Sequence, residues 1–146
     1  MSLRAIMENV PATSINEGTT AAIIVKQSNG KFSMAYAQYD GYLDGVGAEL
    51  IDNFYSQEGA NQLVDERESG EIRGIDNGEV EFYSVSDRKG KAILITNASD
   101  KKVIKEAKSF GSYIYYWDGQ DWYYADSGYK SNVKSVEDID LILDGD

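Results

Sequence analysis

Two β-forming runs joined by an Asn-Gly pair decide the fold: residues 20–39 read TAAIIVKQSNGKFSMAYAQY. β-branched residues dominate the first run, and the large side chains of Phe32, Met34 and Tyr36 alternate with smaller ones in the second run. Both residues of an Asn-Gly pair readily take the positive φ angles that a tight two-residue turn requires. The stretch therefore predicts a β-hairpin.

Helical and extended patterns follow this hairpin along the chain. Apolar residues at helical spacing predict a helix over residues 46–55 and a second one from 58 to 68. Residues 79–85 and 91–96 are rich in β-forming side chains and predict a pair of strands around a polar turn. Ser99 is predicted to cap a helix that covers residues 100–110.

A second hairpin is predicted late in the chain, where Asp118-Gly119 separates two aromatic strands. A short last helix is predicted to begin near Ser135. These elements indicate an α+β fold, with a mainly antiparallel sheet built from hairpins and three or four short helices. We expect a single domain over residues 20–146, preceded by an N-terminal arm or loop over residues 1–19.

The composition excludes several classes of function. The 146 residues include no cysteine and no histidine, which rules out disulfide frameworks, the usual zinc sites and catalysis by Ser-His or Cys-His pairs. The carboxylates are numerous, but no pair of them has the spacing of a calcium loop or the signature of a glycosidase. We therefore expect no catalytic residue, no metal and no cofactor.

Charge is distributed unevenly along the chain, whose net charge is −11. Residues 40–81 carry a net charge of −10 and residues 137–146 a net charge of −5, so the remainder is slightly basic. This balance disfavours direct binding to nucleic acid. No apolar run of about 18 residues is present, so we predict no membrane span and a location in the cytoplasm.

Residues 36–47 read YAQYDGYLDGVG. This stretch resembles a motif of a family of small proteins from phages and bacterial mobile elements, in which Tyr-x-x-Trp-Asp-Gly-Tyr-x-x-Gly-x-Gly enters a helix. Tyr39 stands where the family has tryptophan, and Ala37-Gln38 where Cys-His is frequent. The resemblance implies an accessory phage protein and no catalytic activity. The residues alone also allow a purely structural interpretation, a strand-to-helix turn whose glycines take positive φ and whose Tyr42 covers the core.

The first functional hypothesis is a non-enzymatic, phage-type protein that acts in the host cytoplasm. It binds and inhibits a host protein, either a defence enzyme or a nucleic-acid-handling protein with a basic surface, through an acidic surface that mimics nucleic acid. The candidate partner-binding residues are Asp44, Glu49, Asp52, Asp65, Glu66 and Glu68. The same acids also fit a role in solubility alone, and the sequence leaves a homodimer open.

The alternative hypothesis is a protein that binds and sequesters a small ligand, either a signalling nucleotide or a sugar. The candidate ligand-binding residues are Tyr39, Asp40, Tyr42, Trp117 and Trp122. A phosphorylated ligand requires that Lys31, Arg73, Arg88 or the lysine-bearing helix converge on these residues. The rings of the late hairpin also fit a structural role, in which they pair across the strands and pack on the core.

Overall fold

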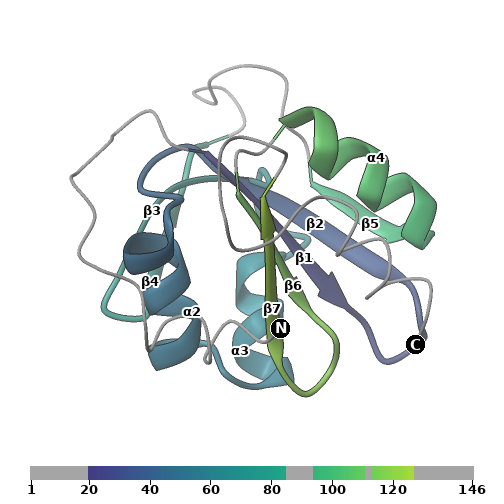
Figure 1. Ribbon diagram of the computed structural model, residues 1–146, viewed down its shortest axis with the longest axis horizontal. Helices are drawn as coiled ribbons and strands as arrows, with labels where there is room; N and C mark the ends of the chain where they lie inside the picture. The colour runs from purple at the N-terminus through teal and green to yellow at the C-terminus, as the bar shows by residue number, and fades with distance from the viewer. Residues whose placement is uncertain (1–19, 85–93, 111–112, 127–146) are drawn as a thin grey trace.

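The structure is a computed structural model that describes residues 20–84, 94–110 and 113–126 (Figure 1). In this part of the chain, one sheet contains seven strands: β1 (Ala21–Lys26), β2 (Phe32–Ala37), β3 (Glu71–Asp76), β4 (Glu79–Phe82), β5 (Ile95–Ala98), β6 (Tyr113–Trp117) and β7 (Trp122–Asp126). Their order is β4-β3-β2-β1-β6-β7, and β5 pairs with β2. The predicted N-terminal arm and the predicted helix near Ser135 lie outside the described residues.

The sheet is mixed. Antiparallel pairs form between β1 and β2, β2 and β5, β3 and β4, and β6 and β7, whereas β1 runs parallel to β6 and β2 runs parallel to β3. The sequence predicts a mainly antiparallel sheet because a short turn specifies the pairing of only the two strands that it joins. Parallel neighbours need a longer crossover connection, and here helices lie between β2 and β3 along the chain.

The strand β3 is not predicted from the sequence, which predicts a helix over residues 58–68 and no further element before residue 79. Instead β3 pairs with β4 across the turn Asn77-Gly78, whose φ angles are 52° and 83°. The predicted pairing of residues 79–85 with 91–96 is wrong for the described part of both segments, because β4 pairs with β3 and β5 pairs with β2.

The helix predicted over residues 58–68 is shorter in the structure, whereas the helix predicted over residues 100–110 has the predicted bounds. The helical elements of the described residues are the π-helical turn η1 (Leu43–Gly47), α2 (Ala48–Asn53), α3 (Gln57–Leu63) and α4 (Asp100–Phe110). Ser56 caps α3 and Ser99 caps α4, since each hydroxyl accepts a hydrogen bond from the backbone N–H three residues further on, at 2.9 and 3.3 Å. None of the helices within the described ranges is long and apolar enough to cross a membrane.

Helices cover both faces of the sheet, which gives three layers (Figure 1). Leu50 of α2, Phe54 directly after α2 and Leu63 of α3 pack on one face. Val103 and Ala107 of α4 pack on the other face. The central strands β1 and β2 are buried on both faces, which explains why residues 21–25 form an uninterrupted apolar run.

Candidate functional site

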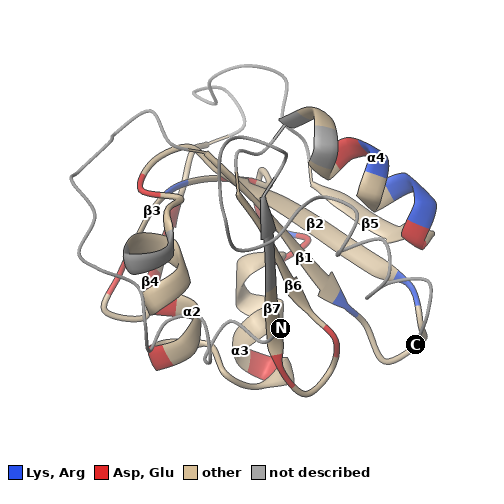
Figure 2. Cartoon of the chain, in the orientation of Figure 1, with Lys and Arg blue, Asp and Glu red and all other residues tan. Residues whose placement is uncertain are grey.

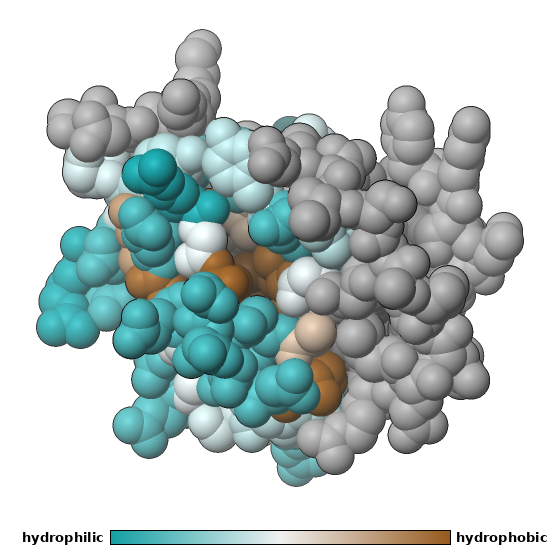
Figure 3. Space-filling view, turned by 90° about the vertical axis from the view of Figure 1, so that its left-hand side faces the viewer, coloured by the Kyte–Doolittle hydropathy of each residue, from teal (hydrophilic) through white to brown (hydrophobic). Residues whose placement is uncertain are grey.

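One hollow of about 740 Å³ lies between the η1–α2 segment and the pair of strands β3 and β4. Figure 3 shows this side of the molecule, with hydrophobic residues in the depth of a hollow and hydrophilic residues around them. Its aliphatic lining residues are Val46, Ala48, Ile75 and Val80. Its acidic lining residues are Asp40, Glu49, Asp52, Asp76, Glu79 and Glu81. Because no lysine or arginine within the described ranges lines it, we call it the acidic hollow.

The motif segment between β2 and η1 forms one wall of the acidic hollow. The hydroxyl of Tyr115 donates a hydrogen bond to the carbonyl of Gly41 at 2.7 Å. A Cβ atom on Gly41 would lie 2.7 Å from the carbonyl oxygen of Thr20, and one on Gly45 would overlap the carbonyl oxygen of Asp40. The glycines are therefore needed for close packing. The expectation that they take positive φ is wrong, because in this segment Asp40 has the positive φ, 56°.

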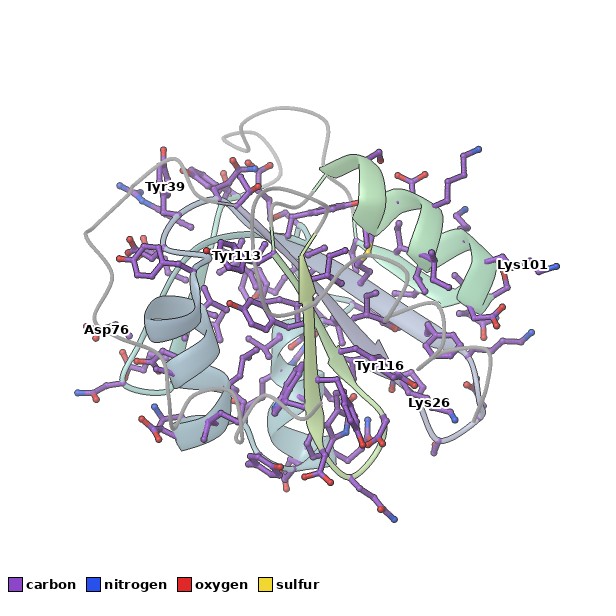
Figure 4. All side chains as sticks on the ribbon, in the orientation of Figure 1. Lys26, Tyr39, Asp76, Lys101, Tyr113 and Tyr116 are labelled. Carbon is purple, nitrogen blue, oxygen red and sulfur yellow. The ribbon has the colours of Figure 1, made fainter. Side chains whose placement is uncertain are left out.

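Two predicted ligand-binding tyrosines line the acidic hollow. Tyr42 is 7% exposed, and its hydroxyl donates a hydrogen bond to Oδ1 of Asp40 at 3.1 Å. Tyr39 is 37% exposed and is hydrogen-bonded to Tyr83, whose pKa is raised first by burial and then by this hydrogen bond. In Figure 4, Tyr39 and Asp76 both project from the left side of the molecule. Tyr39 thus offers an aromatic surface beside the hollow.

Glu49 lines the acidic hollow, but its carboxylate also holds the β3–β4 turn. Oε2 accepts a hydrogen bond from the backbone N–H of Asn77 at 3.1 Å, and Oε1 accepts one from the N–H of Gly78 at 3.1 Å. Oε1 also accepts from the side-chain amide of Asn53 at 2.9 Å. These hydrogen bonds attach the turn to α2, so Glu49 has a structural role independent of any partner.

The remaining acids of the hollow divide into paired and unpaired groups. Glu81 lies 3.7 Å from Nη1 of Arg73, and both side chains are exposed. Asp52, Asp76 and Glu79 make no hydrogen bond or ion pair through their side chains with any described residue. The acidic hollow therefore presents three carboxylates that have no ion-pair partner in the described part of the chain.

The other predicted partner-binding acids lie elsewhere. Asp65 and Glu66 line a second hollow of about 720 Å³ beside the C-terminal end of α3. Oδ2 of Asp65 lies 2.7 Å from Nη2 of Arg67, and the side-chain hydrogen bonds of Arg67 lower the pKa of Asp65 to about 2. Glu68 is exposed and lines neither hollow. The backbone of Asp44 belongs to η1, and its side chain lies outside what the structure describes.

The two tryptophans proposed as ligand-binding residues are in the core. Trp117 and Trp122 are 2% and 0% exposed, and their ring centroids lie 5.4 Å apart. Nε1 of Trp117 donates to Oε1 of Gln57 at 3.0 Å, and Nε1 of Trp122 donates to the carbonyl of Phe54 at 3.1 Å. The rings thus join β6 and β7 to the helices beside them. The structure does not bring them together with the other three predicted ligand-binding residues.

A group of exposed lysines lies on the opposite face of the sheet. Figure 2 shows blue segments on α4 and red segments around α2 and β3. Among the described side chains of α4, the exposed lysines are Lys101, Lys102 and Lys105. Lys31 follows the β1–β2 turn, Arg73 belongs to β3, and Arg88 lies outside the described residues. Arg73 lies near Tyr39, because its guanidinium is 5.9 Å from the ring centroid of Tyr83, which is hydrogen-bonded to Tyr39. The lysines of α4 lie on the other face of the sheet, so they do not join Arg73 there as a phosphorylated ligand would require.

The sequence did not predict that residues of β3 and β4 line the acidic hollow. The acids on this side are Asp76, Glu79 and Glu81, which belong to the acidic stretch of residues 40–81. They were not candidate partner-binding residues, because β3 was not predicted. The pair Asn77-Gly78, with Ile75 two residues before it and Val80 two residues after it, was the signal that could have found this hairpin. Within the described ranges, no three acidic side chains are grouped so that they could hold a metal ion.

Comparison with known proteins identifies no relative of this chain. No protein-family model, curated protein or solved structure matches this chain. The resemblance of residues 36–47 to a phage family therefore stays a prediction from the sequence, and the function has to be argued from the geometry of the acidic hollow.

Proposed function

We propose that this chain is a non-enzymatic, phage-type accessory protein that binds a host protein through the acidic hollow and inhibits it. The proposed partner is a defence protein or another nucleic-acid-handling protein, whose basic surface the hollow occupies in place of nucleic acid. One observation carries the proposal: Asp52, Asp76 and Glu79 line a single hollow, and none of the three is ion-paired with a described lysine or arginine.

Lysine and arginine side chains suit the lining of the acidic hollow. Their aliphatic stems can pack on Val46, Ile75 and Val80, while their charged ends reach the carboxylates. The exposed ring of Tyr39 adds a surface for cation–π contact, and tyrosine is enriched among the residues that dominate interface energies. A basic protein surface therefore matches both the charge and the apolar part of the hollow.

The lysines of α4 do not cancel this negative charge. They lie on the other side of the sheet from α2 (Figure 2), and at physiological ionic strength interactions between exposed charges are largely screened beyond about 8 Å. An approaching partner thus meets an acidic side and a basic side separately. Association through the acidic side should be fast at low salt and should weaken as salt is added.

The test compares the wild type with two variants that lose the same number of charges. The hollow variant carries Asp52→Asn, Asp76→Asn and Glu79→Gln. The control variant carries Glu58→Gln, Glu66→Gln and Glu68→Gln, at exposed positions outside the acidic hollow. All six positions are exposed, so both variants should fold, which circular dichroism checks.

Each protein is immobilised and exposed to a bacterial host lysate, and the retained proteins are identified and challenged with duplex DNA. We expect the wild type and the control variant to retain a basic nucleic-acid-binding protein that DNA displaces, and the hollow variant to lose it. The proposal fails if the hollow variant retains that protein as strongly as the wild type, or if DNA does not compete.

A further inference from the structure

The second hollow differs from the acidic hollow in its chemistry. It lies where the β1–β2 turn, the end of α3 and β5 meet. Five amide side chains from these separate parts of the chain line it: Gln27, Asn29, Asn61, Gln62 and Asn97. We call it the amide hollow, because amides are its most numerous side chains.

A largely buried serine places its hydroxyl in the amide hollow. Ser33 lines the hollow from β2 and is 5% exposed. Phe32 and Met34 belong to the core on the α4 side, so the alternation of the strand places Ser33 on the α3 side. Among the described residues, none is hydrogen-bonded to its side chain. Oγ of Ser33 is not one of the described buried atoms that lack a hydrogen-bond partner, so it is accessible from the hollow and can bond a molecule held there.

The strand β5 is irregular next to this serine. Two residues of β5, Thr96 and Asn97, oppose the single residue Ser33 of β2, which makes a β-bulge. Asn97 has a φ of 53°, and its side-chain oxygen accepts a hydrogen bond from the amide of Asn29 at 3.4 Å. Bulges and left-handed residues re-aim side chains at functional sites. Asn97 is one of the two residues of this bulge, and it also lines the amide hollow.

The lining selects a neutral ligand with many hydroxyl groups. An amide side chain both donates and accepts hydrogen bonds, as a sugar hydroxyl does. Glu58 and Glu66 add acceptors, and no described lysine or arginine lines the hollow, so an anionic ligand meets repulsion. No described aromatic ring lines it, so a nucleobase has no stacking surface. We propose that the amide hollow binds a sugar or a similar neutral polyol through Ser33, Asn97 and Gln62.

Nuclear magnetic resonance can test this site on the full chain. The ¹⁵N-labelled protein is titrated with glucose, galactose, mannose and N-acetylglucosamine up to tens of millimolar, and with glucose 6-phosphate as the anionic counterpart. We expect at least one neutral sugar to shift the side-chain amide signals of Asn97 and Gln62 and the backbone signal of Ser33 in a saturable way. Glucose 6-phosphate should bind about tenfold more weakly than that sugar, because it is repelled by the carboxylates.

Two variants and one control make the result specific to the amide hollow. Ser33→Ala removes one hydrogen bond to the ligand and should weaken sugar binding about fivefold. Gln62→Ala lies on the exposed side of α3 and should have a similar effect without disturbing the core. The hollow variant defined above should bind sugar like the wild type, so the two sites are tested independently.

Three results would overturn the proposal. The first is the absence of saturable shifts with every neutral sugar. The second is binding of glucose 6-phosphate as tight as that of the neutral sugars. The third is wild-type affinity for sugar in both the Ser33→Ala and the Gln62→Ala variants, which would mean that any sugar contact is adventitious.

Discussion

The attachment of the β3–β4 turn to α2 can be measured through Glu49. Glu49→Ala removes the acceptor of hydrogen bonds from the backbone N–H groups of Asn77 and Gly78 and from the side chain of Asn53. The substitution deletes no core residue, since the side chain lies at the rim of the acidic hollow. A loss of stability in this variant would therefore report the loss of these hydrogen bonds.

The expected loss follows from the exposure of each donor. A hydrogen bond to a charged group contributes about 1.5–3 kcal/mol. Asn77 and Asn53 are exposed, so water replaces the carboxylate there and each bond contributes only about 0.3 kcal/mol. The N–H of Gly78 is partly buried and contributes about 1.5 kcal/mol. The total is about 2 kcal/mol, which corresponds to a fall in Tm of roughly 4–8 °C for a chain of this size.

Urea unfolding followed by circular dichroism measures this difference. Asp52→Ala is the matched control, because Asp52 is an exposed acid on the same helix without a described partner, and its change should stay within about 0.5 kcal/mol. Glu49→Gln retains one acceptor oxygen and should lose about half as much as Glu49→Ala. If Glu49→Ala and Asp52→Ala unfold at the same urea concentration, the assigned structural role of Glu49 is refuted.

Two further predictions concern the motif turn and the Asp65–Arg67 pair. Gly45→Ala places a Cβ against the carbonyl of Asp40 and should lower the free energy of unfolding by about 3 kcal/mol. Gly74→Ala meets no described atom within 4 Å and should raise it by about 0.5–1 kcal/mol, so equal stability of the two variants in urea would contradict this packing. The carboxyl of Asp65 should titrate near pH 2 by nuclear magnetic resonance, and Arg67→Ala should return its pKa toward about 3.9. Because the pKa is lower in the folded state, the stabilising contribution of Asp65 is complete above about pH 4 and is lost toward pH 2, so Asp65→Asn should reduce acid sensitivity in that window.

Local signals predict some elements well and miss others for identifiable reasons. The helix predicted over residues 100–110 is confirmed as α4, because Ser99 caps it and its apolar residues lie on one side. The strand β3 was missed because a bulge near Gly74 breaks the alternation of its apolar residues. Its pairing with β2 brings together residues far apart in the chain. Such a pairing depends on tertiary packing, which periodicity within one segment does not report.

The sites show the same division between local and long-range information. The sequence places the excess of acids in residues 40–81 but does not show which of them share a hollow. Glu49 and Asp52 are three residues apart on one helix, yet the first carboxylate binds the β3–β4 turn and the second has no described partner. The amide hollow was beyond prediction, because its side chains come from segments that only the folded sheet brings together.

The motif glycines and the acids of the hollow have separable roles. Gly41 and Gly45 permit close backbone contacts that form the wall of the acidic hollow, and a larger residue at either position would displace that wall. Asp52, Asp76 and Glu79 occupy exposed positions, where substitution costs the fold little. A chain with the same glycines can therefore keep the hollow while its charges change. If the acidic hollow binds a partner, the choice of partner must depend on these exposed carboxylates and not on the motif that shapes the turn.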